Sequence, residues 1–324
     1  MKIKSTKSGG KITAESFSKH RLKESRQENI IYFIMALPAL ISLLIWKIIP
    51  MFGIVIAFKD YSYAKGIFGS DWVGFKNFEV YFKNKDFAML LRNTLGYNIT
   101  FLLLTATTLG VIMAILFYQV RNKIANKVYH TAMILPSFIS YVIIAYIVYT
   151  FLNPSYGFAN TILSNILGRE VSIQWYEQPS YWPFILIFVE MWRDIGMASL
   201  YFYASLLAID TELFEAARLD GANKLQETWY IAVPEVMPMV CTVLILRCGS
   251  LLSGDMGLFY QVPMNQQKLR SVTEVFSTYV YRGIQDGSFS TTAAIGLFNS
   301  VVGMILLLLS NTIIRKIDKS KAIF

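Results

Sequence analysis

Four charged residues stand well inside two consecutive apolar stretches of the sequence. Glu190, Arg193 and Asp194 fall near the middle of one such stretch, and Arg247 falls in the outer half of the next. An arginine at the centre of a membrane span costs roughly 2.5–3.5 kcal/mol on insertion scales, so we expect partners or water around each charge. The carboxylates could bind a proton or a cation, or the cluster could line a path for a polar solute.

A structural interpretation competes with both. Glu190 and Arg193 are three residues apart and can pair on one helix face. Arg193 could therefore be satisfied by Glu190 or Asp194, and the group would hold its span against neighbouring helices. We favour this interpretation, with the path as the functional alternative. Trp192, beside the cluster, could stack on a solute ring.

No residue pattern indicates an enzyme. The two histidines, His20 and His130, lie outside the apolar stretches, and no Ser/His/Asp or Cys/His arrangement surrounds them. Cys241 and Cys248 share roughly one face of a predicted helix and are read as small apolar fillers. The spacing of these residues is not that of metal ligands, so we expect no metal.

A polar segment, Asp210–Pro238, separates two apolar stretches. We expect a short helix capped by Asp210 or Thr211, a turn at Gly221 and a second helix that continues into the membrane. The alanines of this first helix leave a flat surface that a groove of another protein can approach, with Leu213 and Phe214 as apolar anchors. The residues that set the spacing are Glu215, Ala216, Ala217, Gly221, Ile231 and Pro234.

Composition places the chain in a membrane. Hydrophobic residues make up 55%, charged residues 16%, and the mean hydropathy is +0.46. We predict an all-α integral membrane protein with six transmembrane helices. The predicted spans are about 30–58, 93–118, 131–152, 182–207, 231–252 and 291–314.

The basic residues indicate orientation. The net charge of +9 comes from lysines and arginines that flank the spans, so a membrane-orienting role explains it without nucleic acid. We expect a mobile cytoplasmic tail over 1–29, a cytoplasmic loop over 208–230 and a cytoplasmic tail over 315–324. Both termini then lie in the cytoplasm.

The spacing EAA-x3-G-x9-I-x2-P between two spans resembles the signature loop of permease subunits in binding-protein-dependent ABC importers. The resemblance covers most of residues 31–324, which are similar to LplB-type permeases, a polysaccharide-uptake branch of these importers. The motifs that carry it include Pro50–Gly53, Trp72–Gly74, Arg92–Thr94, Leu135–Pro136, Asn153–Pro154 and Tyr279–Arg282.

The resemblance implies a type I ABC importer permease fold, with a permease core over about 90–314 and residues 208–230 as a cytoplasmic coupling loop. It also implies a second homologous permease, two copies of a cytoplasmic ATPase, an extracellular or periplasmic solute-binding protein and an oligosaccharide as substrate. In the functional alternative for the charged cluster, it would contact sugar hydroxyls or, through Arg193 and Arg247, a sugar carboxylate.

The chain carries no Walker A sequence; the nearest approach, Ser8–Ile12, lacks the upstream glycine and the hydroxyl residue after lysine. We therefore expect no cofactor on this chain, with ATP and magnesium bound by the partner ATPase. The alternative is an ion-coupled carrier that uses Glu190 and Asp194 as titrating groups, although no inverted repeat supports it.

Overall fold

The computed structural model describes residues 14–323, with side chains from Asn29 onward. These residues fall into two units that divide after Val55. Nearly every regular element is a helix; among the described residues, the strands β1 (Lys59–Asp60) and β2 (Asp71–Trp72) form one antiparallel hairpin.

The first unit is a continuous helical run. It contains α1 (Ala14–Leu43), the π-helix η1 (Leu44–Ile48) and α2 (Ile49–Met51), and the 3-10 helix η2 (Phe52–Phe58) crosses into the second unit. The predicted tail over 1–29 is corrected in part: residues 1–13 lie outside the described residues, but the helix already begins at Ala14. Residues 14–29 contain no glycine or proline and many good helix formers, so the helix extends beyond the apolar run.

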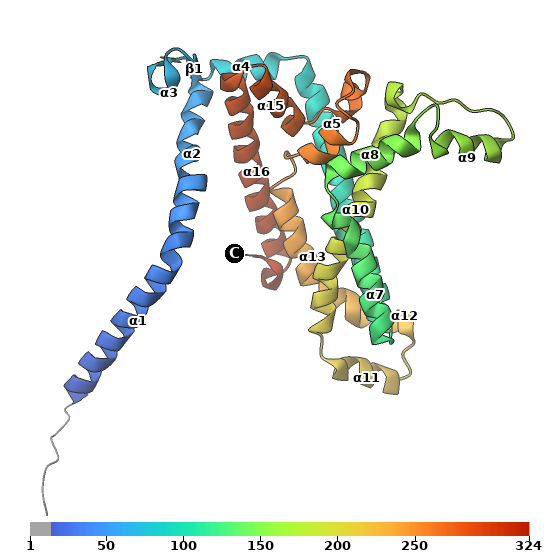
Figure 1. Ribbon diagram of the computed structural model, residues 1–324. Helices are drawn as coiled ribbons and strands as arrows, with labels where there is room; N and C mark the ends of the chain where they lie inside the picture. Colours follow the sequence, from blue (N-terminus) through green and yellow to red (C-terminus); the bar gives the residue numbers. More distant parts are fainter. Residues whose placement is uncertain (1–13, 324) are drawn as a thin grey trace, which may run out of the picture. The chain divides into compact units, whose positions relative to one another are not determined.

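The second unit contains the remaining helices, drawn in Figure 1. In chain order they are α3 (Gly66–Gly69), α4 (Lys76–Lys83), α5 (Asp86–Phe101), η3 (Leu102–Leu109), α6 (Gly110–Tyr118), α7 (Lys123–Ile134), η4 (Leu135–Phe138), α8 (Tyr141–Leu152), α9 (Phe158–Leu167), η5 (Trp175–Glu177), η6 (Pro179–Tyr181), α10 (Trp182–Leu207), α11 (Thr211–Leu219), α12 (Lys224–Glu227), η7 (Thr228–Ala232), α13 (Val233–Cys248), η8 (Gly257–Gln261), η9 (Gln267–Leu269), α14 (Arg270–Thr273), α15 (Phe276–Gln285), α16 (Phe289–Ile317) and η10 (Lys319–Lys321).

Four helical runs in the described residues are long and apolar enough to cross a membrane: Asn29–Phe58, Asp86–Tyr118, Lys224–Cys248 and Phe289–Ile317. A bent pair, Lys123–Phe138 with Tyr141–Leu152, makes a fifth if it counts as one span. The predicted fourth span is α10, over the same residues. At 26 residues it is about 39 Å long, but its three central charges set it apart from the four apolar runs.

Three predicted spans differ from the helices observed. The fifth, predicted over 231–252, lies in the run Lys224–Cys248, because α12 and η7 continue into α13 without a break and α13 ends at Cys248. The second was predicted from Asn93, but α5 begins at Asp86, because Asn84 accepts the amide of Asp86 at 3.0 Å and starts the helix earlier. The third was predicted as one span over 131–152, but its two halves meet at 94°. Pro136 cannot donate a backbone hydrogen bond, and Ser140 caps the start of α8 by accepting the amide of Ile143.

Helix α10 packs closely against α7, the helix before this bend. A Cβ atom built on Gly196 would lie 1.9 Å from the carbonyl oxygen of Met133. Only a residue without a side chain lets α10 approach the end of α7 so closely. The backbone of α10 therefore lies directly against the last turn of α7.

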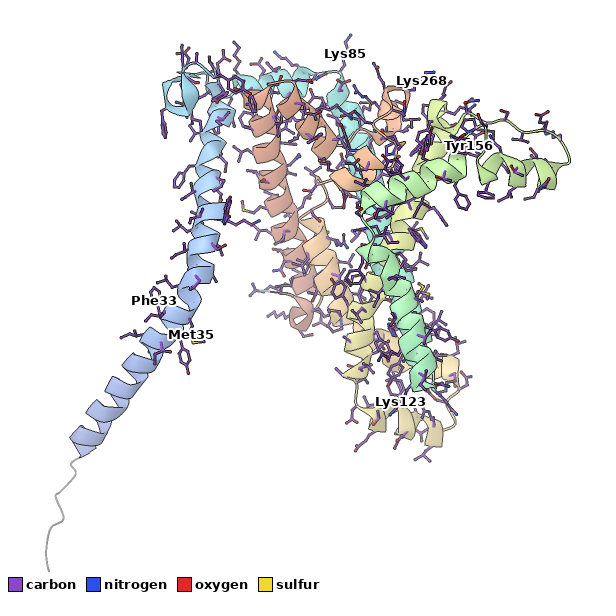
Figure 2. The ribbon with its side chains drawn as sticks, in the orientation of Figure 1. Phe33, Met35, Lys85, Lys123, Tyr156 and Lys268 are labelled. Atoms are coloured by element: carbon purple, nitrogen blue, oxygen red, sulfur yellow. The ribbon has the colours of Figure 1, made fainter. Side chains whose placement is uncertain are left out.

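The core of the second unit consists of three buried clusters. One lies beside α11 and contains Phe202, Leu206, Phe214 and Val236. The others join α8, α10 and η8, and α4, α5, α15 and α16. In Figure 1, α11 lies at one end of this unit, and α4 and α15 lie at the opposite end. Figure 2 shows Lys123 at the α11 end and Lys85 and Lys268 at the other.

The predicted tail over 315–324 is ordered through Ile323. Helix α16 continues to Ile317, and the Asp318 side chain caps η10 by accepting the amide of Ser320 at 3.0 Å. Hydrogen bonds from the Ser320 hydroxyl and from Lys321 hold the pKa of Asp318 at about 2.

We predict that Gly196→Ala destabilises the second unit by about 1–3 kcal/mol, because the added methyl group overlaps backbone that cannot move alone. The measurement is the thermal unfolding midpoint in detergent micelles. Gly296→Ala is the matched control, since a Cβ at Gly296 in α16 meets nothing within 4 Å. Equal midpoints for the two variants would contradict the packing described above.

Candidate functional site

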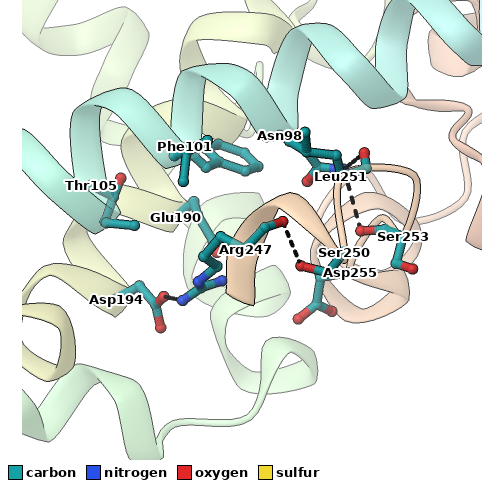
Figure 3. A pocket seen from close by; sticks show the side chains of 12 residues that line it. Asn98, Phe101, Thr105, Glu190, Asp194, Arg247, Ser250, Leu251, Ser253 and Asp255 are labelled. Carbon is teal, nitrogen blue, oxygen red and sulfur yellow. Dashed lines mark hydrogen bonds and ion pairs between the residues drawn. The ribbon is translucent and has the colours of Figure 1, made fainter. Parts of the chain in front are cut away.

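A polar cavity of about 100 Å³ lies between α5, α10 and the end of α13 (Figure 3). Its lining includes three carboxylates, from Glu190, Asp194 and Asp255, and one guanidinium, from Arg247. The remaining polar side chains are Asn98, Thr105, Ser250 and Ser253. Acceptors and hydroxyls therefore dominate the cavity.

Tyr141, at the start of α8, connects two of the charged residues of α10. Its hydroxyl donates to Glu190 Oε2 at 2.8 Å and accepts from Arg193 Nη1 at 3.1 Å. The guanidinium carbon of Arg193 also lies 4.2 Å from the centre of the Tyr141 ring, a cation–π contact. Glu190 is only 9% exposed, so this hydroxyl satisfies an otherwise buried carboxylate.

Arg193 mainly supports the bend. Its Nη2 donates to the carbonyl oxygen of Ser137 at 3.3 Å, and Nη1 lies 3.9 Å from Asp194 Oδ1. In the described residues no ion pair joins Glu190 to Arg193, so the predicted i, i+3 pair is corrected: Tyr141 stands between the two. The structural interpretation fits Arg193, which does not line the cavity.

Asp194 and Arg247 form an ion pair across the cavity, 3.2 Å from Nη2 to Oδ2. The pair joins the middle of α10 to the last turn of α13. Asp255 Oδ1 accepts hydrogen bonds from the amides of Gly257 at 2.7 Å and Leu258 at 3.3 Å, which fixes that carboxylate at the start of η8. The one guanidinium on the cavity wall is thus already paired with a carboxylate of this chain.

The sequence placed some of these residues correctly and missed others. Glu190, Asp194 and Arg247 meet at one cavity, whereas Trp192 lies on an apolar groove between α8 and α10, beside Phe188 and Ile147. Trp192 does not line the cavity, because two helix positions turn it away from Glu190 and Asp194. Asn98, Tyr141 and Asp255 were missed. Asn98 donates to the carbonyls of Leu251 and Ser253, a contact that sequence spacing does not reveal.

The segment over 208–230 forms two short capped helices. The Asp210 side chain accepts the amide of Glu212 at 3.0 Å and starts α11. At its end, Ala222 N donates to Ala217 O at 2.9 Å and Gly221 N to Arg218 O at 3.1 Å, with Gly221 at φ +84°. This is the Schellman end that Gly221 predicted.

A buried carboxylate fastens α11 to α12. Arg218 Nε lies 2.9 Å from Glu227 Oε1, and Lys224 Nζ lies 2.8 Å from Glu227 Oε2. The Glu227 side chain is 6% exposed, whereas both cations are about half exposed. Asn223 and Gln226 add a capping box at the start of α12. The turn around Gly221 is therefore held from both sides.

Phe214 points into the protein and not outward. It is 5% exposed and packs in the cluster of Phe202, Leu206 and Val236, 5.7 Å from the Tyr118 ring. Its prediction as a docking anchor is corrected: Phe214 ties α11 to the transmembrane core. Four residues at positions i, i+3, i+4 and i+7 form the opposite, exposed face of α11: Glu212, Glu215, Ala216 and Leu219.

The other residues of the predicted coupling set divide in the same way. Leu213 is 49% exposed and Leu219 is 90% exposed, so Leu219, which the sequence analysis missed, is the more accessible apolar contact. Ala217 is half-buried. Ile231 packs against the Phe214 cluster, and Pro234 occupies the first turn of α13.

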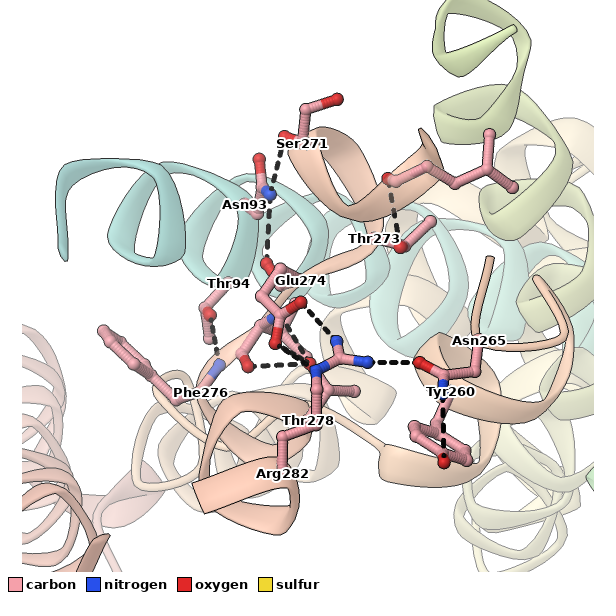
Figure 4. Close-up of polar contacts among 12 residues, drawn as sticks. Asn93, Thr94, Tyr260, Asn265, Ser271, Thr273, Glu274, Phe276, Thr278 and Arg282 are labelled. Carbon is pink, nitrogen blue, oxygen red and sulfur yellow. Dashed lines mark hydrogen bonds and ion pairs between the residues drawn. The ribbon is translucent and has the colours of Figure 1, made fainter. Parts of the chain in front are cut away.

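A second polar network closes the end of the unit opposite α11 (Figure 4). The amide of Asn93 in α5 donates to the carbonyls of Ser271 at 3.1 Å and Glu274 at 3.0 Å. The buried carboxylate of Glu274 pairs with Arg282 of α15. Two of the motifs quoted from the sequence, around Asn93 and Arg282, therefore meet in space.

Among the side chains that the structure describes, residues 29–323, no group of three or more His, Cys, Asp and Glu is placed to hold a metal ion. The polar groups described above are arranged for hydrogen bonding and for ion pairing with one another. What this geometry can offer is a hydrogen-bonding cavity in the membrane and a short exposed helix at one end.

Comparisons with known proteins agree with this arrangement. Residues 106–321 match the family described as binding-protein-dependent transport system inner membrane component. Protein LplB of Bacillus subtilis is 35% identical over 288 residues, covering 89% of each chain. The polygalacturonan/rhamnogalacturonan transport system permease protein YteP of the same organism is 34% identical, covering 88% of this chain and 87% of the relative.

A solved structure has the same fold. It is the crystal structure of a bacterial ABC transporter involved in the import of the acidic polysaccharide alginate. One of its chains superposes with a TM-score of 0.81 at 31% identity, covering 92% of this chain and 99% of that one. The same likeness holds for that transporter in complex with an alginate pentasaccharide-bound periplasmic protein.

We predict that Tyr141→Phe destabilises the protein by about 1–3 kcal/mol, because the buried Glu190 carboxylate loses its donor. The measurement is the midpoint of denaturant unfolding in mixed micelles. Tyr146→Phe on the same helix is the control, since Tyr146 is 61% exposed. If both variants unfold at the wild-type midpoint, Tyr141 does not stabilise Glu190.

We predict that Phe214→Ala loosens α11, with a cost of about 3–5 kcal/mol for a buried phenylalanine. Hydrogen exchange of the amides over 211–219 measures this and should become much faster. Leu219→Ala, at a 90% exposed position of the same helix, should leave the exchange unchanged. Equal exchange in the two variants would show that the Phe214 contact does not hold the helix.

Proposed function

The chain belongs to the family of binding-protein-dependent transport system inner membrane components, and on this premise we propose that the cargo it imports is an oligosaccharide. It is a membrane-spanning permease of an ABC importer and not an enzyme. Support for the cargo comes from its relatives. One is named for polygalacturonan and rhamnogalacturonan transport, another for arabinooligosaccharides, and a third takes part in alginate import.

The exposed face of α11 is the proposed contact with a cytoplasmic ATPase. Glu215 and Ala216 lie on this face, and the small alanine allows close approach of a groove, with Leu213 and Leu219 as apolar contacts at its edges. The two helix ends and the Glu227 ion pairs keep this surface in one shape. Two copies of the ATPase would bind ATP and magnesium, since this chain has no Walker A sequence.

The remaining partners follow from the same premise. A second, homologous permease would complete the translocation path. A solute-binding protein would deliver the sugar; the alginate transporter has been solved with such a protein.

The proposed orientation puts α11 and both termini in the cytoplasm of a prokaryotic cell. The segments on that side carry seventeen lysines and arginines and the opposite segments ten, although the opposite segments between spans are longer. The three remaining lysines and arginines, Lys47, Arg193 and Arg247, lie within predicted spans.

The polar cavity is the proposed part of the sugar path in this chain. Its carboxylates and hydroxyls are suited to accept and exchange hydrogen bonds with sugar hydroxyl groups. The cavity wall carries three carboxylates, from Glu190, Asp194 and Asp255, and one guanidinium, Arg247, whose charge Asp194 already neutralises. This excess of negative charge favours uncharged sugar residues over uronates. The relatives offer no support for an ion-coupled carrier that would use Glu190 and Asp194.

We predict that Glu215→Lys and Gly221→Val each leave the protein in the membrane but abolish ATP-dependent oligosaccharide uptake. The first reverses charge at the proposed contact, and the second forces a β-branched residue into the left-handed region at φ +84°. The measurement is uptake by proteoliposomes that contain the complete transporter and its binding protein, alongside the amount of membrane-inserted chain.

Glu170→Lys is the control, because it makes the same charge reversal at an exposed site far along the chain from α11. It should transport like the wild type. Unchanged uptake in both coupling variants would refute the role proposed for α11.

A further inference from the structure

An uninterrupted stretch of 28 residues, Tyr141–Gly168, contains no charged residue, in a chain that is 16% charged. It comprises α8, a five-residue connection and α9. In Figure 1 these two helices (green) extend to one side of α10, toward the end of the unit opposite α11. Tyr156, in the connection, is labelled there in Figure 2. A connection surrounded by water normally carries charges, so this composition needs an explanation.

Helix α9 has one apolar half and one polar half. At 3.6 residues per turn, the apolar side chains fall on one side of the axis and the uncharged polar ones on the other. The apolar set is Phe158, Ala159, Ile162, Leu163, Ile166 and Leu167; the polar set is Asn160, Thr161, Ser164 and Asn165.

Two side chains of the polar half form hydrogen bonds with the loop that follows α9. Asn160 is 6% exposed; its amide donates to Ile173 O at 3.1 Å, and its oxygen accepts from Trp175 Nε1 at 2.9 Å. Ser164 accepts the amide of Val171 at 2.9 Å. The loop after α9 therefore folds back over the polar half, and no water is needed to satisfy these two side chains.

The apolar half is left exposed. Phe158 is 59% exposed, Ile162 49% and Ile166 73%. This surface continues onto α8, since the rings of Phe151 and Phe158 lie 5.6 Å apart and Phe151 is itself 51% exposed. The exposed apolar surface is thus shared by a helix of the bent membrane pair and by the short helix that follows it.

We propose that α9 lies in the membrane interface on the side opposite α11, with its apolar half in the acyl region of the lipids. A helix with this division of faces lies in the plane of the interface. Tyrosines on α8 and in the connection, at 146, 149 and 156, are the residues that anchor chains at that depth.

A lipid surface fits this half of α9 better than a protein partner. Protein interfaces are ringed by a polar rim, but charge first returns at Arg169 and Glu170, beyond the end of the helix. The continuity of α9 with α8, which belongs to a membrane-crossing pair, points the same way. The proposal needs the chain to be membrane-embedded, which family membership establishes, and is independent of the cargo.

The test is the depth of a nitroxide spin label in the complete transporter, reconstituted without the binding protein in nanodiscs of phosphatidylethanolamine and phosphatidylglycerol. The label is attached to Ile162→Cys, and separately to Ile166→Cys, after Cys241→Ala and Cys248→Ala remove the native thiols. Both positions are exposed, so the substitutions remove little packing. Phe68→Cys in α3, at a 96% exposed position, is the matched control.

We expect the ratio of oxygen to nickel-chelate accessibility to be several-fold higher at Ile162 and Ile166 than at Phe68. High nickel-chelate accessibility at both α9 positions would place the helix in water and overturn the proposal. Low accessibility to both reagents would show that a protein covers the helix, and would overturn it as well.

Discussion

A helix that bends inside a membrane frees backbone carbonyls where no water can reach them. The structure solves this at the 94° break between η4 and α8 with a single cation, since Arg193 donates to the freed carbonyl of Ser137. That guanidinium must then be satisfied in turn, which the Tyr141 ring and hydroxyl and, at longer range, Asp194 accomplish. The bend therefore accounts for a charged residue, Arg193, in the middle of α10. Its neighbours Glu190 and Asp194 line the cavity.

The two surfaces proposed to function are carried by the same two helices. Helix α10 holds Asp194 in its middle and Leu206 near its end, where Leu206 packs with Phe214 of α11. Helix α13 holds Val236 in the same cluster at one end and Arg247 at the other. Two continuous helices therefore connect the cluster that holds α11 to the Asp194–Arg247 pair, without an intervening loop.

The sequence predicted features that depend on local rules. Gly221 predicted a left-handed helix end, and the span predicted over 182–207 has the same bounds as α10. Both features depend on residues that are neighbours in the sequence. Features that depend on tertiary partners escaped. Phe214 was predicted, together with Leu213, to be an apolar anchor, and only the position of Phe202 shows that Phe214 faces inward. Asn98 and Tyr141 gave no signal at all, since their partners lie far along the chain.

The distance between these two surfaces has a mechanical consequence. Twelve residues separate Asp194 from Leu206, which is about 18 Å of helix at 1.5 Å per residue. If this part of α10 tilts as a rigid rod about Leu206 by about 10°, Asp194 moves by about 3 Å, which is about the length of a hydrogen bond. The 3.2 Å contact of Asp194 with Arg247 is therefore short enough for a slight rocking of α10 to open or close it.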